Sequence, residues 1–449
     1  MINMMMEQAR AAQKIFETFN QEDVDKIVRE IGKAVYDNAE ILARMAVDET
    51  KMGVYEHKVA KNKGKAKIIW HDLKDKKSVD EISRDLDKNI IEIAKPIGVV
   101  GAVTPTTNPI VTPMCNAMFA LKGRNAIIIA PHPRAKGCSS KTVAIINERI
   151  EALGAPKHLI QIISEPSIEY TNALMQAVDV VVATGGMGMV KAAYGSGKPA
   201  YGVGAGNVQV IVDRDVDFDV TAKNILAGRI FDNGIICSGE QSVIAHREDY
   251  DTLINAFNKQ GGFLIFDHEE KRRLRETLFV NGHMNKDVVG QSVQDIAKLA
   301  RLEIPMHTIA LMVEADGIGE ADLFCREKMC PVLATFKYDN FKEGIKIAKT
   351  NLELEGNGHS AAIHSNNFEN IKEVGKVLSV SRLVVNAASS TTAGGSFTNG
   401  FAPTTTLGCG SWGNNSISEN FTYKHLLNIS RIGLIRENVR VLEDHEIWG

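Results

Sequence analysis

Residues 97–130 read IGVVGAVTPTTNPIVTPMCNAMFALKGRNAIIIA, and this stretch decides the fold. Two short apolar runs, 97–103 and 126–130, enclose a segment of helical pattern, 114–121. Apolar runs of this length, bounded by turn residues, are typical of strands that are buried on both faces. Strand, helix and strand at this spacing predict two parallel strands joined by a right-handed crossover.

The alternation of apolar runs and helical patterns continues beyond this stretch. The further apolar runs are 159–163, 178–183 and 208–212, and the helical patterns between them are 139–153, 167–177 and 187–194. A second region of the same alternation extends from about 216 to 386. The pattern predicts an α/β fold whose parallel strands are covered by helices on both faces and bind ligands at their carboxyl ends.

Two other regions differ from this alternation. Residues 4–48 carry apolar side chains at helical spacing, and the lysine-rich stretch 58–77 is expected to be helical as well. Residues 387–413 are rich in Gly, Ser and Thr and almost uncharged, which fits either a disordered linker or a packed loop beside a substrate. Large apolar residues favour the packed loop. They are Phe397, Phe401, Leu407 and Trp412.

The size and charge of the chain set the broad class. With 449 residues, two or three lobes are expected. We divide the chain into three parts, 1–215, 216–410 and 411–449. The net charge of −3 gives no reason to expect nucleic-acid or membrane binding. Six scattered cysteines and an N-terminus without an apolar signal core indicate a reducing cytoplasm and no metal site.

One cysteine stands out by its surroundings. Cys237 lies in FDNGIICSGEQS, residues 231–242, directly after the turn signal Asn233-Gly234. A cysteine after a turn and among small residues can be exposed to a ligand as a nucleophile. A buried cysteine that packs as a small hydrophobe explains the local pattern equally well.

Five segments, in order and at matching spacing, resemble the aldehyde dehydrogenase superfamily, in the CoA-acylating branch. FDNGIICSGEQS resembles the nucleophile segment of that branch. The other four segments are IGVVGAVTPTTNP, VVATGG, EKMCPV and LGCGSWGNNSISEN. Within the branch, residues 94–133 and the segments SRLVVN, TTAGGSF and NISRIG are most similar to the CoA-dependent enzymes of succinate semialdehyde. The resemblance covers essentially the whole chain and implies an α/β fold in three parts. They are N-terminal helices with a Rossmann-like dinucleotide-binding domain at 1–215, an α/β catalytic domain at 216–410, and a C-terminal segment at 411–449 with a role in oligomerisation.

The resemblance implies a catalytic role for Cys237. The thiolate of Cys237 would add to an aldehyde, and the resulting oxyanion would need hydrogen-bond donors. The backbone N–H of Cys237 and the side chain of Asn108 are the candidates. Thr107 occupies the position at which the wider family has Asn, so it remains an alternative. His359 is a further candidate, as a proton shuttle for the CoA thiol, although a histidine in a turn would look the same.

The expected acyl acceptor is coenzyme A. Hydrolytic members of the family carry a Glu in a segment that resembles ELGGKN, and this chain has GVGAGN there, with Gly202 at the Glu position. Without that base, water should attack the thioester slowly, whereas a thiol would accept the acyl group readily. The expected reaction interconverts succinate semialdehyde and succinyl-CoA. Acetaldehyde is the alternative substrate, and a hydrolytic enzyme or a non-catalytic assembly protein is less favoured.

The resemblance also implies a set of cofactor-binding residues. They are Thr104, Pro105, Thr106, His132, Pro133, Arg134, Thr184, Gly185, Gly186, Gly204 and Glu327, the last of which would hold the nicotinamide ribose. NAD-preferring relatives often have a Glu where this chain has Pro133, and Arg134 or Lys136 can pair with a 2′-phosphate. NADP is therefore favoured over NAD. The same basic residues would also serve the 3′-phosphate of CoA or simply face solvent.

The far end of the substrate is a carboxylate, which requires a cation or several donors. The first candidate is the hydroxyl cluster of the loop after SRLVVN, which comprises Ser389, Ser390, Thr391 and Thr392. The second candidate is Arg229, eight residues before Cys237, for which a surface helix charge is an equal alternative. Small-molecule substrates and a homodimeric assembly complete the expectation.

Overall fold

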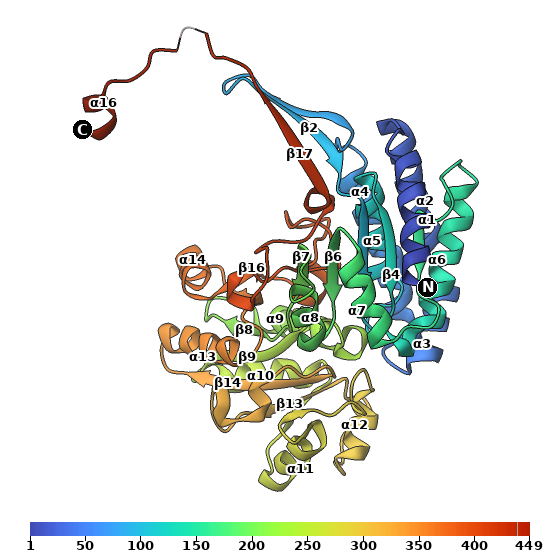
Figure 1. The fold of residues 1–449 in the computed structure, drawn as a ribbon. Helices are drawn as coiled ribbons and strands as arrows, with labels where there is room; N and C mark the ends of the chain where they lie inside the picture. The colour runs from blue at the N-terminus through green and yellow to red at the C-terminus, as the bar shows by residue number, and fades with distance from the viewer. Residues whose placement is uncertain (438) are drawn as a thin grey trace.

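The computed structural model describes residues 1–437 and 439–449, which form two lobes around two parallel sheets (Figure 1). The first sheet has five strands and confirms the predicted strand–helix alternation. In spatial order its strands are β5 (Ile160–Ile162), β4 (Ala126–Ala130), β3 (Val99–Val103), β6 (Val180–Thr184) and β7 (Ala200–Val203). The crossovers contain α5 (Val111–Lys122), α6 (Lys136–Glu151), α7 (Ile168–Ala177) and α8 (Met187–Tyr194).

The strand order reverses direction at the centre of the first sheet. From β3 the chain adds β4 and β5 on one side, and it then returns to add β6 and β7 on the other side. The loops that follow β3 and β6 therefore diverge at the carboxyl ends of two adjacent strands. Such a switch point leaves a crevice in which ligands of α/β proteins bind.

Four N-terminal helices belong to the first lobe, where the first of them contacts the sheet and the other three contact α5 or α6. They are α1 (Ile2–Phe16), α2 (Gln21–Asp37), α3 (Ala39–Thr50) and α4 (Tyr55–Leu73), so the predicted helical regions are confirmed. Apolar residues at helical spacing, such as Phe16, Ile27 and Ile31, are fully buried in the core that these helices share with the sheet. Helix α4 also contacts the segment just before Cys237, which places it beside the functional site.

The second sheet has seven parallel strands. In spatial order they are β10 (Gly262–Ile265), β13 (Ala310–Glu314), β14 (Val332–Tyr338), β9 (Glu240–His246), β8 (Val208–Val212), β15 (Gly358–His364) and β16 (Val380–Val385). Its helices are α9 (Phe218–Ile230), α10 (Tyr250–Lys259), α11 (His268–Leu278), α12 (Val293–Leu299), α13 (Phe341–Leu354), α14 (Phe368–Val377) and the short α15 (Ser389–Thr392). The hairpin β11 (Phe279–Val280) and β12 (His283–Met284) completes this lobe.

The placement of β8 corrects the sequence prediction, which grouped residues 208–212 with the first domain. The strand pairs with β9 and β15 in the second sheet. Asn207, just before it, is fully buried and donates its amide hydrogens to the carbonyls of Cys325, Asn351 and Glu355 in the second lobe. An apolar strand pattern does not reveal to which sheet the strand belongs. Here the buried hydrogen bonds of Asn207 hold β8 in the second lobe.

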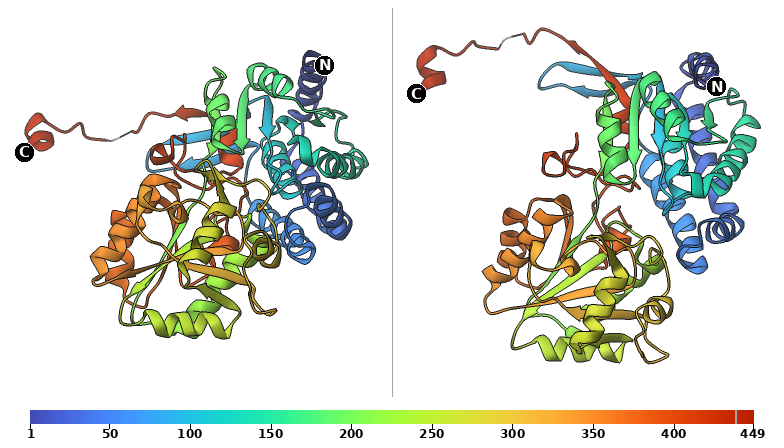
Figure 2. Two further views of the ribbon diagram at one scale, coloured as in Figure 1. Left: turned by 90° about the horizontal axis from the view of Figure 1, so that it is seen from below. Right: turned by 60° about the horizontal axis from the view of Figure 1, so that its bottom comes forward.

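The last segment of the chain joins a third, antiparallel sheet. Its strands are β1 (Asp80–Asp85), β2 (Ile90–Pro96) and β17 (Leu427–Gly433). Strands β2 and β17 lie side by side, and the chain beyond β17 leads away from the body to α16 (Asp444–Trp448), as Figures 1 and 2 show. No helix among the described residues is long and apolar enough to cross a membrane.

Two of the four large apolar residues in the Gly-, Ser- and Thr-rich region 387–413 pack in a core as predicted, whereas Phe397 and Trp412 are exposed. Leu407 is only 5% exposed and belongs to the core of the second lobe. Phe401 packs against the same core. Phe397 is 64% exposed, yet it lines a cavity beside α4, so its role is in the functional site and not in the core.

Candidate active site

Cys237 lies where two cavities meet. The first, which we call the α4 cavity, has a volume of about 380 Å³ and is bounded by helix α4 and the loop 390–407. The second, the sheet cavity, has a volume of about 360 Å³ and opens at the carboxyl ends of β3, β4 and β6. Three residues line both cavities, namely Asn108, Cys237 and Thr405. Their position marks the junction at which a ligand in one cavity can react with a ligand in the other.

The backbone before Cys237 has an uncommon conformation. Helix α9 ends at Ile230, and the short turn that follows, η2 (Phe231–Gly234), places Asp232 and Asn233 at φ values of 54° and 52°. Left-handed backbone at a non-glycine residue is unfavourable and persists only where contacts impose it. Asp232 is fully buried and ion-paired to helix α4, which supplies those contacts. The turn closes with a hydrogen bond from Gly239 N to Ile236 O of 2.8 Å, which presents Cys237 at the junction.

The prediction that Arg229 binds substrate is wrong. Its side chain is fully buried and lines neither cavity within the described residues. The guanidinium donates to the carbonyl oxygens of Glu240, at 2.6 Å, and Gly234. These two carbonyls flank the Cys237 turn on both sides, so the arginine holds the turn in place. The sequence correctly placed Arg229 near the end of a helix. Its periodicity did not show that this side of the helix faces the protein interior.

The thiol of Cys237 is protonated in the free protein. Burial raises its pKa to about 12, the Glu327 carboxyl and the Cys409 thiol act in the same direction, and the nearby Arg382 guanidinium opposes them. The thiolate is therefore a minor form at neutral pH, and its share rises with pH. Arg382 itself is buried, and it donates to the carbonyls of His359 at 2.6 Å and Gly408 at 2.9 Å.

The sheet cavity gathers the residues predicted to bind the cofactor. Of that set, all except Arg134 line it, namely Thr104, Pro105, Thr106, His132, Pro133, Thr184, Gly185, Gly186, Gly204 and Glu327. The Oγ1 atom of Thr104 is buried and has no hydrogen-bond partner among the described residues. A side chain at Gly186 would project into open space, so the cavity keeps room there for a ligand. These features fit a nicotinamide dinucleotide at the switch point.

Two of these residues have shifted acidities. Burial, together with Glu355, raises the pKa of Glu327 to about 8, although Arg229 opposes the shift. Burial also lowers the pKa of His132, whose Nδ1 accepts a hydrogen bond from the Arg134 backbone at 3.1 Å. Glu327 is thus largely a neutral carboxylic acid at pH 7, suited to exchange hydrogen bonds with hydroxyl groups. The side chain of Arg134 is exposed just beyond Pro133, outside the cavity lining.

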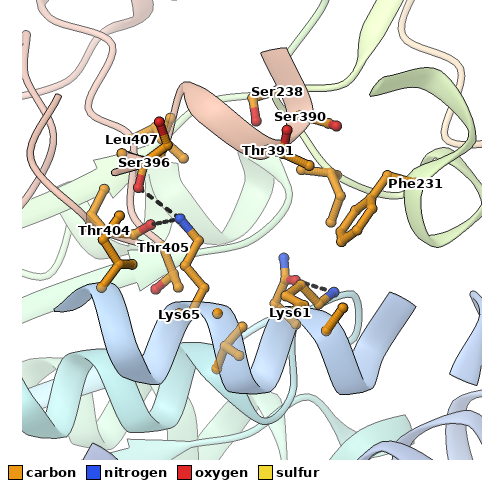
Figure 3. Close-up of a pocket in the computed structure, with 18 of the residues that line it drawn as sticks. Lys61, Lys65, Phe231, Ser238, Ser390, Thr391, Ser396, Thr404, Thr405 and Leu407 are labelled. Carbon is orange, nitrogen blue, oxygen red and sulfur yellow. Dashed lines mark hydrogen bonds between the residues drawn. The ribbon is translucent and has the colours of Figure 1, made fainter. Parts of the chain in front are cut away.

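Helix α4 contributes two lysines that the sequence analysis did not identify. Figure 3 shows Lys61 and Lys65 on the face of α4 that points into the α4 cavity. Lys61 Nζ donates to Asn108 Oδ1 at 2.8 Å, and Lys65 Nζ donates to the carbonyls of Gly394 at 2.7 Å and Thr404 at 3.1 Å. A signal existed, because Lys58, Lys61 and Lys65 recur at helical spacing within a stretch expected to be helical. Thr405, at the junction, carried no comparable signal.

Part of the predicted hydroxyl cluster lines the α4 cavity. Ser390 and Thr391 face it from helix α15, opposite α4 (Figure 3). Ser389 and Thr392 do not line it. Ser389 is fully buried and its backbone N–H donates to Glu240, whereas the hydroxyl of Thr392 donates to the Ala388 carbonyl at 2.8 Å. A short helix turns only some of its consecutive side chains toward one side, so four adjacent hydroxyls cannot all reach one ligand.

His359 and Gly202 are also placed differently from the prediction. His359 is fully buried on β15, lines neither cavity within the described residues, and its Nδ1 lies 3.1 Å from Ser360 Oγ. Burial, reinforced by Arg382, lowers the pKa of His359 well below its usual value. A side chain at Gly202 would meet Val190 and Tyr194, away from Cys237. The sequence motif located both residues near the site, but the strands on which they lie turn them away from the junction.

Thr107 and Asn108 can now be distinguished by position. Thr107 lines the sheet cavity, whereas Asn108 lines both cavities beside Cys237. The arrangement as a whole combines a dinucleotide crevice at a switch point, a cysteine at its inner end, and a second cavity on the other side of that cysteine. This arrangement fits a dehydrogenase, with Cys237 as the candidate nucleophile.

Known proteins identify the family of this dehydrogenase. The model of the aldehyde dehydrogenase family matches residues 1–405. The chain is 55% identical over 448 residues to the succinate-semialdehyde dehydrogenase (acetylating) of Clostridium kluyveri, covering 100% of this chain and 99% of the relative. It is 42% identical over 456 residues to the sulfoacetaldehyde dehydrogenase of an Acholeplasma species, covering 100% and 94%. The crystal structure of an acetylating aldehyde dehydrogenase from Geobacillus thermoglucosidasius superposes with a TM-score of 0.94, at 38% identity and 98% coverage of each chain. The chain belongs to the aldehyde dehydrogenase family.

Proposed function

We propose that this protein is an acylating aldehyde dehydrogenase that interconverts succinyl-CoA and succinate semialdehyde with NADP(H). Cys237 carries the acyl group, and Lys65 binds the carboxylate at the far end of the substrate. The observation that carries the substrate assignment is the Lys65 ammonium, which faces the α4 cavity without an anionic partner. The relatives support this choice, since the C. kluyveri and Acholeplasma enzymes are named for aldehydes with an anionic tail.

The charge of Lys65 is not neutralised by the protein. Its ammonium donates to two backbone carbonyls, and it forms no ion pair within residues 1–437 and 439–449. Lys61 and Lys67 also line the α4 cavity, and no Asp or Glu among the described residues does so. Burial lowers the pKa of Lys65 to about 8, the thiols of Cys115 and Cys237 raise it, and Lys61 lowers it further. A desolvated ammonium with a free N–H bond favours an anionic ligand strongly.

The position of Lys65 fits a four-carbon acid. Lys61 contacts Asn108 at the junction, and Lys65 lies one helical turn farther, about 6 Å along α4 at the usual rise per residue. In succinate semialdehyde the carboxylate is separated from the aldehyde carbon by two methylene groups. An aldehyde carbon at Cys237 can therefore place its carboxylate toward Lys65, whereas acetaldehyde has no group that reaches it. Ser390 and Thr391 add hydroxyl donors on the opposite wall of the cavity.

The steps of the reaction follow from the junction. The Cys237 sulfur loses its proton and adds to the aldehyde carbon, and the oxygen becomes an oxyanion held by hydrogen-bond donors. A nicotinamide dinucleotide held by the residues that line the sheet cavity would supply the acceptor for the hydride that leaves this carbon. The acyl group then remains on Cys237 as a thioester. The CoA sulfur attacks the thioester carbonyl, the bond from that carbon to the Cys237 sulfur breaks, and the Cys237 sulfur takes up the proton that the CoA thiol loses as acyl-CoA is released.

Transfer to CoA, not to water, rests on the carboxyl groups near Cys237. The missing base at Gly202 does not carry this argument, because a side chain there would meet Val190 and Tyr194. Among the described residues, Glu327 is the single Asp or Glu that lines the two cavities, and it lies in the sheet cavity. Its pKa of about 8 leaves it mostly protonated at pH 7. A protonated acid is a poor base for water, so the thioester should persist until a thiol attacks it.

Lys65→Met is expected to lower kcat/KM for succinyl-CoA about 30- to 100-fold and to change that for acetyl-CoA less than about 5-fold, because only succinyl-CoA loses a charge-assisted contact. The assay is the oxidation of NADPH, followed at the nicotinamide band, with both substrates. Lys67→Met, at the exposed side of the same cavity, is the matched control. Equal losses for both substrates would refute the anchoring role. A wild type that prefers acetyl-CoA would refute the substrate itself and favour acetaldehyde.

The acidity of Lys65 adds a pH dependence to this prediction. Because burial depresses its pKa to about 8, the ammonium is charged below that value and loses its proton as the pH rises through it. The ratio of kcat/KM for succinyl-CoA to that for acetyl-CoA is therefore expected to fall above pH 8 in the wild type and to be flat in Lys65→Met. If sulfoacetyl-CoA is the best substrate instead, the anion-binding role of Lys65 stands and the four-carbon assignment falls.

The preference for NADP rests on Arg134, which stays a prediction from the sequence. Arg134 is exposed, follows Pro133 of the cavity lining, and is not ion-paired among the described residues, whereas Lys136 is paired with Glu165 at 2.6 Å. Arg134→Ala is expected to lower kcat/KM for NADPH about 5- to 50-fold and for NADH less than about 3-fold, through loss of an Arg–phosphate pair. Lys136→Ala is the control. Equal losses for both cofactors would place Arg134 at the pyrophosphate or at CoA. A cytoplasmic location and a homodimer also remain predictions.

A further inference from the structure

Helix α4 and the turn before Cys237 are joined by a buried network of charges. The carboxylate of Asp232 is fully buried and accepts hydrogen bonds from Lys58 Nζ at 3.0 Å, Lys61 Nζ at 2.6 Å and Val54 N at 2.9 Å. The Asp232 backbone N–H donates to His57 Nδ1 at 2.9 Å. All four partners belong to α4 or to the residue that precedes it, so the left-handed turn at Asp232 is fixed to this helix from several directions.

Lys61 connects this network to the reacting centre. Its ammonium bridges Asp232 Oδ2 and Asn108 Oδ1. Lysine has donors and no acceptor, so the atom of the Asn108 amide that faces Lys61 must be the oxygen. The NH₂ group of the same amide then points the other way. Since Asn108 lines both cavities beside Cys237, its NH₂ group is available at the junction.

We propose that Lys61 is a positioning residue that holds the Asn108 amide with its NH₂ group directed at the oxyanion formed on Cys237. Thr107 lines only the sheet cavity, so Asn108 supplies the side-chain donor. Lys61 adds a second effect, because its positive charge polarises the amide and makes the N–H a stronger donor. Asp232 in turn keeps Lys61 in place. Burial alone would raise the pKa of Asp232, but Lys61 and Lys58 lower it below its usual value, so the carboxylate stays ionised.

The inference rests on cysteine chemistry at Cys237 and not on the four-carbon substrate. The test therefore uses acetyl-CoA as well as succinyl-CoA. A wild type that reduces neither would refute the acylating function, and the same variants would then be compared in aldehyde oxidation. This separates failure of the proposed function from failure of the role of Lys61.

Lys58 offers a matched control, since both lysines pair with Asp232 but only Lys61 contacts Asn108. Lys61→Met is expected to lower kcat about 10- to 100-fold and to change KM less than about 3-fold, because oxyanion contacts act in the transition state. Lys58→Met is expected to lower the unfolding temperature at least as much, since Lys58 is the more buried of the two, while kcat stays within about 3-fold. Equal loss of kcat in both variants would overturn the proposal.

A double-mutant cycle with Asn108→Ala gives the decisive readout. If Lys61 acts through Asn108, Lys61→Met should lower kcat less than about 3-fold further once Asn108 is already alanine. The full loss in that background would show that Lys61 acts by another route and would overturn the proposal. Lys61→Gln serves if Lys61→Met does not fold. A neutral amide there permits either orientation of Asn108, so an intermediate loss of kcat with the same non-additivity is expected, and an additive loss would again overturn the proposal.

Discussion

Replacing Cys237 by alanine is expected to lower kcat for acyl-CoA reduction at least ~10⁴-fold, because no thioester can form without a nucleophile. Binding of NADPH and the unfolding temperature should change little. The thiol lies at the junction of the two cavities and is held by a turn that Arg229 braces on both sides. Steady-state kinetics with succinyl-CoA, cofactor titration by fluorescence and thermal unfolding measure these three quantities.

Cys409 provides the control for this variant. It is a buried thiol near enough to Cys237 to raise its pKa, yet it lines neither cavity within the described residues. Cys409→Ala is expected to retain kcat within about 5-fold. Turnover by Cys237→Ala at more than about one per cent of the wild-type rate would exclude Cys237 as the nucleophile. Loss of activity in Cys409→Ala alone would transfer that role to Cys409.

Gly206→Ala is expected to lower kcat at least ~100-fold, because misplacement of a nucleophile by about 1 Å has effects of this size. A Cβ atom at Gly206 would lie 1.7 Å from the carbonyl oxygen of Cys237. The Cβ atom is fixed rigidly to the main chain of residue 206 and the carbonyl oxygen belongs to the main chain of Cys237, so relief requires the backbone of the Cys237 turn or of residue 206 to move. The turn is fixed by the buried Arg229 and Asp232, which means that the displacement reaches the thiol. Kinetics and the alkylation rate of Cys237 measure the effect.

Gly188 is the matched control for this substitution. A Cβ atom there meets no other atom within 4 Å, and the residue is exposed on helix α8. Gly188→Ala is expected to leave kcat within about 2-fold and to raise stability slightly, since alanine is the better helix former. Wild-type kinetics in Gly206→Ala would mean that the turn yields without moving the thiol, and it would contradict the rigid support described here.

The sequence predicted the elements of the fold better than their assembly. The apolar runs at 97–103 and 126–130 became β3 and β4, because a strand buried on both faces leaves an unambiguous pattern. The sequence predicted a strand at 208–212 but placed it in the wrong sheet. Asn207 holds this strand in the second sheet through hydrogen bonds to residues more than a hundred positions later in the chain, which a local pattern cannot reveal. Strand β7 was missed because its four residues carry a glycine and a tyrosine and show no apolar run.

Site residues whose position depends on the path of the backbone were predicted well. Those whose position depends on the direction of a side chain were predicted poorly. The loops after β3 and β6 deliver Thr104 and Gly185 to the sheet cavity because strand ends fix them. Arg229 was misplaced because the direction of its side chain depends on packing between elements. Lys61 and Lys65 were overlooked because a lysine-rich helix is usually a solvated surface, and only the structure shows which face it turns inward.

The central claim is that Cys237 receives an acyl group from CoA. The most direct measurement is mass spectrometry of the enzyme after incubation with succinyl-CoA in the absence of cofactor, followed by identification of the modified peptide. The acylation rate should rise with pH, since the pKa of about 12 leaves little thiolate at pH 7. We expect one succinyl group on Cys237 for each CoA released, with none on Cys237→Ala. CoA release without a modified Cys237, or a succinyl group on another residue, would contradict the account.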